Sequence, residues 1–156
     1  MRVIIGGTFN HLHRGHIALI SKAFEIGDYV YIGLTTDSYA KSMRHGDVVL
    51  GYQARRKAVE RLARSLGKEF EINPLNDRFG PAPTGNFDAI VVSDETFPVA
   101  VEINAERRKS GLKPLSIVRI PTVMAADSVP ISSSRIRIGE IDKEGNPRRE
   151  GTDCRE

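Results

Sequence analysis

Apolar residues recur along the chain in two patterns, and each pattern predicts a different element. Five short runs rich in valine and isoleucine, bounded by glycine, proline, asparagine or aspartate, predict β-strands. They cover residues 2–5, 29–35, 69–75, 89–93 and 115–121. Three stretches with apolar residues at helical spacing predict α-helices. These are residues 15–26, 52–67 and 98–110.

The alternation of strands and helices is typical of a parallel sheet built from β-α-β units. Because crossovers between parallel strands are right-handed, the pattern predicts an α/β fold, a Rossmann-like three-layer sandwich with a five-stranded parallel sheet. Ligands of such sheets bind at the carboxyl ends of the strands, where the strand order reverses. We therefore expect a site just after the first strand.

The chain has 156 residues, the size of one ordinary domain. We place this domain at residues 1–142 and expect residues 143–156, where charges and chain breakers dominate, to be poorly ordered. Residues 76–86 are rich in glycine and proline and predict a surface loop after the third strand.

Composition narrows the class of protein. Hydrophobic residues make up 40% and charged residues 28%, as in ordinary globular proteins. No apolar run approaches the roughly 20 residues that span a bilayer, and the first residues do not resemble a signal peptide. Cys154 is the single cysteine, so no intrachain disulfide forms. We expect a cytoplasmic protein with no membrane partner.

The net charge is only +3, but basic residues gather in one predicted helix. Five of them lie between residues 55 and 64 against a single acidic residue, Glu60. Such a run fits either an anionic ligand or a solvated helix face, and the solvated face is the commoner case. Aromatic residues make up only 6% and no stacking motif occurs, so we expect no nucleic acid partner.

The sequence GGTFNHLHRGH, residues 6–16, follows the first strand. Gly6 and Gly7 allow a sharp turn and a close approach to a ligand. Gly15 lies at the first turn of a predicted helix, where free N–H groups and the helix dipole favour an anion. The sequence predicts a phosphate site, although neither G-x-G-x-x-G nor G-x-x-x-x-G-K-[ST] is present.

His13 and His16 are three residues apart at this helix start, so both imidazoles can face the same anion. Zinc binding would need further ligands that the neighbourhood lacks. Two readings stay open: histidines that cap a turn, or N–H donors that polarise phosphate oxygens during a displacement. His11 is expected to be a plain loop residue.

A second motif, ISSSRIR, occupies residues 131–137. Its hydroxyls and amides suit a helix start, and Arg135 and Arg137 bring guanidinium groups nearby. Alone this is an ordinary serine-capped helix. With the glycine and histidine turn, it predicts a second phosphate clamp.

Together the two motifs resemble the nucleotidyltransferase superfamily marked by T/GTFDxxHxGH and ISSTxIR. The further blocks YIGLTTD, VVSDET and GEID make the chain most similar to the archaeal-type phosphopantetheine adenylyltransferases, over residues 2–142. Asn10 stands where the superfamily pattern has Asp, and Ser134 replaces its Thr.

The resemblance implies transfer of AMP from ATP to 4'-phosphopantetheine, giving dephospho-coenzyme A and pyrophosphate. A phosphate monoester, with a second pKa of about 6, is largely dianionic at pH 7 and can attack without a general base. Positioning and charge neutralisation then suffice for catalysis. Mg²⁺ would arrive with ATP, held mainly by its phosphates, and no metal site on the protein itself is expected.

The resemblance also implies roles for residues of the first motif. Gly7, Thr8 and Phe9 would lie against ATP, with Thr8 also reaching the acceptor. His13 and His16 would contact the ATP phosphates, and His16 would stabilise the transition state. Thr8 as a simple turn residue and Phe9 as a core residue are the alternatives.

Other implied roles lie further along the chain. Lys41 would be catalytic and bind substrate near the reacting phosphates, unless it is a solvated lysine in a loop. Arg55 would bind substrate, although the assignment could shift to Arg56. The β- and γ-phosphates of ATP would be held by Ser132, Ser133, Ser134 and Arg137.

Two groups near the later strands have open alternatives. The strand-end residues, which could meet the adenine or ribose or else cap a helix, are Asp94, Glu95 and Thr96. Asn104 and Arg107, three apart on one helix, could face the nucleotide or solvent.

Other members of the superfamily are the nearest alternative functions: an FAD synthetase, an NMN adenylyltransferase or a cytidylyltransferase. A regulatory module that binds nucleotides without turnover is the alternative of another class, and the retained histidines speak against it. The resemblance favours a monomer or a small homo-oligomer.

Overall fold

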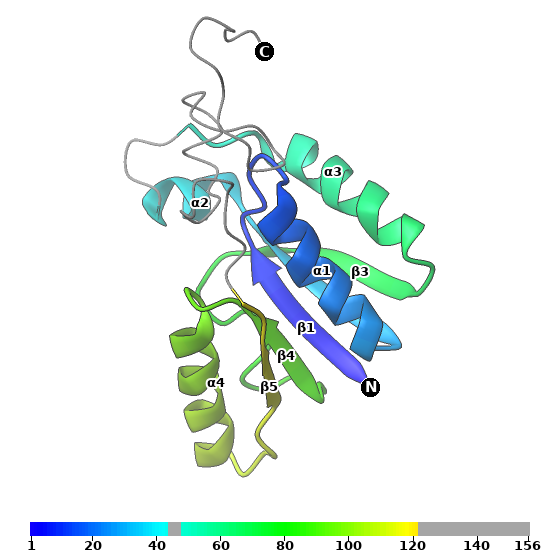
Figure 1. Cartoon of the computed structure of the whole chain (residues 1–156). Helices are drawn as coiled ribbons and strands as arrows, with labels where there is room; N and C mark the ends of the chain where they lie inside the picture. Colours follow the sequence, from blue (N-terminus) through cyan, green and yellow to red (C-terminus); the bar gives the residue numbers. More distant parts are fainter. Residues whose placement is uncertain (44–47, 122–156) are drawn as a thin grey trace, which may run out of the picture.

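Five parallel strands form one sheet in the computed structural model, which describes residues 1–43 and 48–121 (Figure 1). The strands are β1 (Arg2–Gly7), β2 (Tyr29–Thr35), β3 (Glu69–Leu75), β4 (Ala89–Val92) and β5 (Ser116–Arg119). The predicted tail at residues 143–156 and the motif ISSSRIR lie outside the described residues.

The strand order is β3-β2-β1-β4-β5, so β1 is central. The chain builds outward from β1 to β3 and then returns, because β4 pairs with the other edge of β1. The strand order therefore reverses between β1 and β4. This order confirms the expected Rossmann-like fold. The glycine and histidine motif begins inside β1, because Gly6 and Gly7 are the last two residues of the strand and do not form the predicted turn. The rest of the motif follows β1, where such sheets bind ligands.

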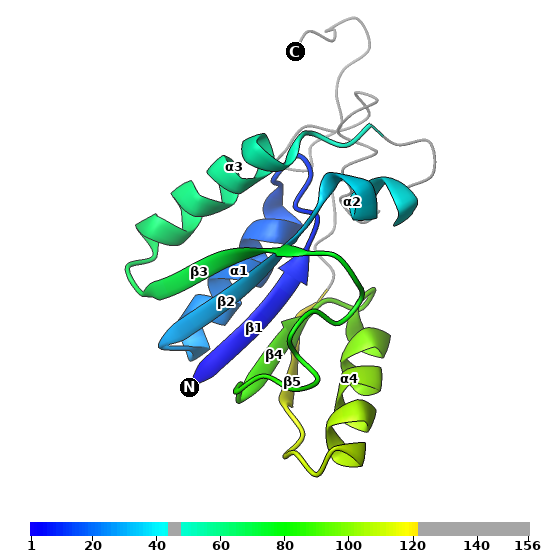
Figure 2. The same ribbon diagram turned by 180° about the vertical axis from the view of Figure 1, so that it is seen from behind.

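Helices cover both faces of the sheet (Figure 2). They are α1 (Arg14–Ile26), α2 (Asp37–Met43), α3 (Tyr52–Ser65) and α4 (Phe97–Lys109). Side chains alternate between the two faces along each strand. Val3 and Ile5 pack with α1 and α3, whereas Ile4 packs in a second cluster with α4.

The short helix α2 was not predicted from the sequence, which indicated a loop around Lys41. Asp37 in its first turn and Lys41 in its last complement the helix dipole. Only Ala40 is buried, and Tyr39 is partly buried. In seven residues this apolar stripe is too short to register as a helical period. Among the described helices, none is both long and apolar enough to cross a bilayer.

The expectation that Asn104 and Arg107 of α4 face the nucleotide or solvent is wrong. Asn104 and Arg107 face neither solvent nor an open nucleotide site, since they are only 5% and 4% exposed. The Asn104 amide donates to the carbonyl of Leu115 at 3.0 Å and accepts from its N–H at 2.8 Å. Buried polar groups need such partners, and the backbone supplies them here.

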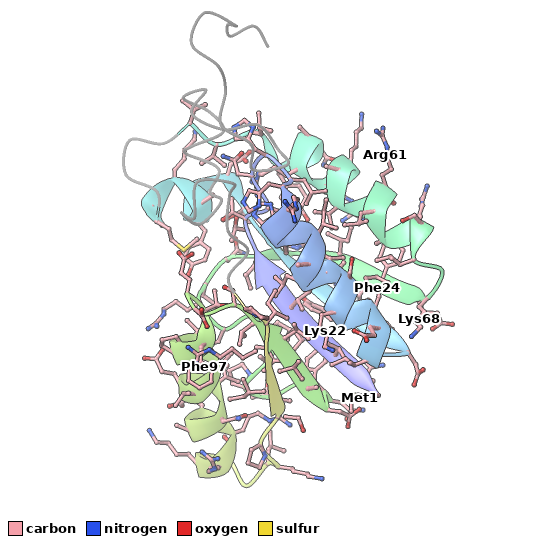
Figure 3. All side chains as sticks on the ribbon, viewed as in Figure 1. Met1, Lys22, Phe24, Arg61, Lys68 and Phe97 are labelled. Atoms are coloured by element: carbon pink, nitrogen blue, oxygen red, sulfur yellow. The ribbon has the colours of Figure 1, made fainter. Side chains whose placement is uncertain are left out.

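The basic residues of α3 also differ in exposure: some are solvated and others bind backbone groups. Arg61 and Arg64 are solvated as expected, and Arg61 points away from the sheet (Figure 3). Arg56 instead donates to the carbonyl of Ile72 at 2.9 Å. Arg55 is completely buried and belongs to the site described next.

Candidate functional site

The turn between β1 and α1 has an unusual backbone. Phe9 and His11 both have φ of 50°, a left-handed conformation that side chains other than glycine rarely adopt. Phe9 is only 2% exposed, and its ring packs against Gly7, where an added Cβ would lie 3.2 Å from Cζ. Phe9 is therefore a core residue, and it also borders the cavity described below. The packed ring holds the turn in its strained shape.

His13 and His16 form a capping box at the start of α1. The Nδ1 atom of His13 accepts from the N–H of Gly15 at 3.1 Å. The Nδ1 atom of His16 accepts from the N–H of His13 at 3.2 Å. Because each Nδ1 accepts, the neutral form of each ring carries its proton on Nε2. Two backbone amides thus fix both imidazoles as Nε2–H donors.

The two imidazole rings also fix each other. They stack with centroids 3.7 Å apart and planes 17° from parallel. The ring of Phe9 meets His16 edge-on at 5.3 Å. The structure shows the capping role of both histidines, which uses Nδ1 of each ring. Both residues also border the cavity described below, so donation to a phosphate stays a prediction.

Arg55 lies behind this turn and joins four segments. Its Nη1 donates to the carbonyl of Thr8 at 3.1 Å and to that of Thr35 at 2.8 Å. Its Nε donates to the carbonyl of Leu50 at 2.7 Å, and its Nη2 pairs with the Asp37 carboxylate at 2.9 Å. The hydroxyl of Thr35 in turn donates to that of Thr8 at 3.0 Å.

This placement bears on the predicted role of Arg55. The side chain is 0% exposed and does not border the cavity, so its contacts are with protein. Arg55 therefore orders Thr8 and the ends of β1 and β2 from behind. Direct binding of substrate by Arg55 stays a prediction that this geometry does not favour.

Asn10, the residue that departs from the superfamily pattern, fastens the turn to the segment before α3. Its Nδ2 donates to the carbonyl of Val48 at 3.1 Å, and its Oδ1 accepts from the N–H of Leu50 at 2.9 Å. The side chain is only 1% exposed. A carboxylate could accept from Leu50 but could not donate to Val48, so the amide is the group that fits.

A cavity of about 830 Å³ opens beside the turn, at the carboxyl ends of the central strands. Thr8, His13 and His16 border it on one side. Its other walls are mainly apolar or aromatic and come from β1, β2, β3, α2, α4 and the loop after β3: Ile4, Tyr31, Tyr39, Met43, Leu75, Phe79, Pro81, Ala82, Val99 and Ile103. The exposed Arg78 of that loop borders the cavity as well. Burial raises the pKa of both Tyr31 and Tyr39, so these walls carry no phenolate charge near neutral pH.

Two glycines keep one wall of this cavity flat. Gly6 and Gly33 are paired neighbours in β1 and β2. A Cβ at either position would touch the Leu75 side chain, at 3.3 Å from Gly6 and 3.4 Å from Gly33. The missing side chains leave room in the cavity beside Leu75.

The structure does not bring every predicted residue to the cavity. Lys41 is exposed on α2 and is not among the residues that border it, whereas Tyr39 and Met43 of that helix are. A catalytic role for Lys41 stays a prediction. Ser132, Ser133, Ser134 and Arg137 lie outside the described residues, so their roles stay predictions as well.

The strand-end residues after β4 have separate roles. Asp94 pairs with Arg119 at 2.7 Å. The Thr96 hydroxyl accepts from the N–H of Ser93 at 3.1 Å and closes the turn before α4. Glu95 is exposed and borders the cavity, so it is the carboxylate of this group that can meet a ligand there.

Residues 1–43 and 48–121 contain no group of three or more histidine, cysteine or carboxylate side chains placed to hold a metal ion. What these residues do offer at the end of β1 is the start of a helix, two oriented imidazoles and an apolar cavity. This combination suits a ligand with a phosphate at one end and an uncharged arm at the other.

The family model described as cytidylyltransferase-like matches residues 4–139. The chain belongs to the cytidylyltransferase-like family.

Within the cytidylyltransferase-like family, the chain is similar to archaeal proteins of one name. It is 46% identical over 154 residues to the phosphopantetheine adenylyltransferase of Methanosarcina mazei, covering 96% of this chain and 98% of that protein. It is 49% identical over 145 residues to the phosphopantetheine adenylyltransferase of Methanopyrus kandleri, covering 91% of each. These similarities put it in the phosphopantetheine adenylyltransferase branch of the family.

A solved structure of a protein of unknown function from Archaeoglobus fulgidus is similar in fold, with a TM-score of 0.71 and 31% identity. It matches 85% of this chain and 100% of that chain. The described residues thus share their fold with a solved archaeal protein.

Proposed function

We propose that the protein transfers AMP from ATP to 4'-phosphopantetheine, giving dephospho-coenzyme A and pyrophosphate. The observation that carries this proposal is the pair of imidazoles fixed as Nε2–H donors beside a large apolar cavity. The similarity to phosphopantetheine adenylyltransferases over nearly the full chain supports the same reaction.

In the proposed reaction, a phosphate oxygen of 4'-phosphopantetheine attacks the α-phosphorus of ATP. A new P–O bond forms there while the bond from the α-phosphorus to the bridging oxygen breaks, and pyrophosphate leaves with the electron pair. The attacking phosphate is already largely dianionic at neutral pH, so the protein need not remove a proton. Its task is to align the groups and to stabilise charge.

The described residues can perform that task at the start of α1. The positive end of the helix dipole favours the triphosphate. The Nε2–H groups of His13 and His16 would donate to phosphate oxygens whose charge rises in the transition state, and His16 has the leading role. Ser132, Ser133, Ser134 and Arg137 complete the proposed clamp on the β- and γ-phosphates.

Mg²⁺ is proposed to come bound to ATP. The ion prefers oxygen ligands and commonly keeps several waters and phosphate oxygens. The described turn offers amides and imidazoles, which suit phosphate oxygens better than they suit Mg²⁺. Mg²⁺ would therefore neutralise phosphate charge while bound to ATP itself.

The acceptor would lie with its phosphate near Thr8 and His16 and its pantetheine arm in the cavity. That arm is long and uncharged, which matches the apolar walls and the space left by Gly6 and Gly33. We further propose that the protein acts in the cytoplasm, as a monomer or small homo-oligomer, without nucleic acid.

The proposal is tested by pyrophosphate release from ATP with a panel of phosphorylated acceptors. 4'-Phosphopantetheine should give rapid release, whereas FMN and NMN should give almost none. Pyrophosphate release with FMN or NMN and none with 4'-phosphopantetheine would show that the protein has another activity of the superfamily. Tight ATP binding with no release for any acceptor would favour a regulatory module.

A further inference from the structure

The loop at residues 76–86, predicted as a plain surface loop, forms one wall of the cavity. Phe79, Pro81 and Ala82 border the cavity from this loop, beside the exposed Arg78. Ala82 is only 1% exposed, so the loop is packed against the body of the protein rather than extended into solvent. The position of these three residues sets the width of the cavity on this side.

Local hydrogen bonds give the loop its shape. The Asp77 carboxylate accepts from the N–H groups of Phe79 and Gly80, at 3.1 and 2.6 Å. The carbonyl of Pro81 accepts from the N–H of Gly85 at 2.7 Å. These bonds are internal to the loop, so they define its turns but do not fix its place relative to the sheet.

Two arginines tie the loop to α4. Arg78 of the loop pairs with the Glu102 carboxylate at the surface, and the buried Arg107 of α4 binds the loop from behind. Its Nη1 donates to the carbonyls of Ala82 and Gly85, at 2.8 and 2.9 Å. Its Nε donates to the carbonyl of Lys113 at 2.8 Å, which ties the same guanidinium to the segment before β5. Arg107 itself does not border the cavity.

A guanidinium is the side chain that suits this position. Its planar fork directs several N–H donors at once in fixed directions, whereas a lysine ammonium is a single point on a flexible stem. A lysine here could not serve all three carbonyls in the directions that the fork does, and it would leave at least one of them buried without a donor, which is unfavourable. Loss of the fork should therefore let the loop shift without removing any group from the cavity wall.

We propose that Arg107 is a positioning residue for acceptor selection, holding Phe79, Pro81 and Ala82 against the arm of the acceptor. This inference rests on the proposed function, since the cavity is taken as the site of that arm. Arg107 touches neither substrate. It acts through the loop, so it should affect the far end of the acceptor and neither ATP nor the reacting phosphate.

The test compares Arg107→Lys and Arg107→Met with the wild-type full-length protein, using two acceptors. One is 4'-phosphopantetheine, and the other is 4'-phosphopantothenate, which has the same phosphate end and a shorter arm that ends in a carboxylate. Because misplacement by about 1 Å can cost a large factor, the KM for 4'-phosphopantetheine should rise at least about tenfold. The KM for ATP and kcat/KM for the short acceptor should change less than about threefold.

Lys68→Met is the matched control. Lys68 also donates to two backbone carbonyls, those of Phe24 and Gly27, at 2.6 and 3.0 Å. Lys68 lies beside the C-terminal end of α1, far from Phe97 at the start of α4 (Figure 3). This variant should leave the preference between the two acceptors unchanged.

Two further measurements decide the remaining outcomes. Phe79→Ala changes the wall directly, and it should reduce the preference for the longer acceptor even if both Arg107 variants unfold.

Calorimetric binding of 4'-phosphopantetheine separates this inference from the proposed function. If the wild type binds this acceptor without turnover and Arg107→Lys binds it more weakly, the proposed function fails and the role of Arg107 stands. Equal losses for both acceptors, or no loss for either, would overturn the role of Arg107.

Discussion

Asn10 and Leu50, 40 residues apart in the chain, are joined by a 2.9 Å hydrogen bond from the backbone N–H of Leu50 to the Asn10 Oδ1. The same amide donates its Nδ2 to the carbonyl of Val48 at 3.1 Å. One buried side chain thus forms hydrogen bonds with both an N–H donor and a carbonyl acceptor of the segment before α3. It lies between the two left-handed residues, Phe9 and His11, so it braces the strained turn that leads to His13.

Asn10→Asp should therefore destabilise the protein although it is nearly isosteric. A buried carboxylate keeps the bond from Leu50 but faces the carbonyl of Val48 with no proton to share. Loss of one buried partner should lower the free energy of unfolding by about 1–3 kcal/mol. Urea unfolding measures it. Asn86→Asp, the same change at an exposed residue, serves as the control. Equal stability of wild type and Asn10→Asp would show that the amide donor contributes nothing.

His16→Asn should separate the capping role of His16 from its catalytic role. The asparagine Oδ1 lies at about the place of the imidazole Nδ1, so it can still accept from the N–H of His13. No donor remains at the position of Nε2. We expect a kcat roughly 100-fold lower, with the KM for ATP nearly unchanged. The free energy of unfolding should fall by only about 1 kcal/mol, from the lost ring contacts with His13 and Phe9. An unchanged kcat would contradict this prediction and would show that His16 only caps the helix.

His11→Asn is the matched control for that experiment. It makes the same substitution in the same turn, and asparagine tolerates the left-handed backbone of this position. His11 does not border the cavity. Turnover by this variant should stay within about threefold of wild type, the range expected when no group that contacts the reacting atoms is lost.

Arg55→Lys should act on the fold and the site together. The lysine cannot replace the fork that reaches Thr8, Thr35 and Leu50, so buried carbonyls lose their donor and stability should fall by at least about 2 kcal/mol. Thr8 would shift with its carbonyl, so the KM values for both substrates should rise together. A rise for the acceptor alone, with normal stability, would instead support direct binding of substrate by Arg55. Arg61→Met, an exposed arginine of the same helix, should change neither quantity.

The sheet was predictable because its strands are short runs of β-branched and other apolar residues between chain breakers, and in β1, β2 and β4 several consecutive residues are buried. The ranges predicted for β2 and β3, residues 29–35 and 69–75, are the observed ones. The phosphate turn was predictable too, since glycines and paired histidines between a strand and a helix form a pattern over eleven residues. In both cases the signal lies in neighbouring residues.

The buried polar ties were not predictable, because their partners are backbone groups from distant segments. Arg55 and Arg107 both bind carbonyls, which every residue possesses and which leave no mark in the sequence. A basic residue on a helix then looks solvated, as Arg61 is. The role of Asn10 was hidden for the same reason, since only the folded chain brings Val48 and Leu50 to it.

Gly33→Ala should separate stability from acceptor binding. The added Cβ would meet Leu75 at 3.4 and 3.5 Å, ordinary contact distances, so the strand accepts it without strain. Replacing a strand glycine by alanine should raise the free energy of unfolding by up to about 1 kcal/mol, because alanine loses less backbone entropy on folding. The same methyl enters the cavity beside Leu75, where the acceptor arm is proposed to lie. The KM for 4'-phosphopantetheine should therefore rise while the KM for ATP stays constant. Gly51→Ala, whose added Cβ meets nothing within 4 Å, provides the control for the loss of a glycine. If Gly33→Ala is more stable and binds the acceptor as well as wild type does, the arm does not occupy this part of the cavity.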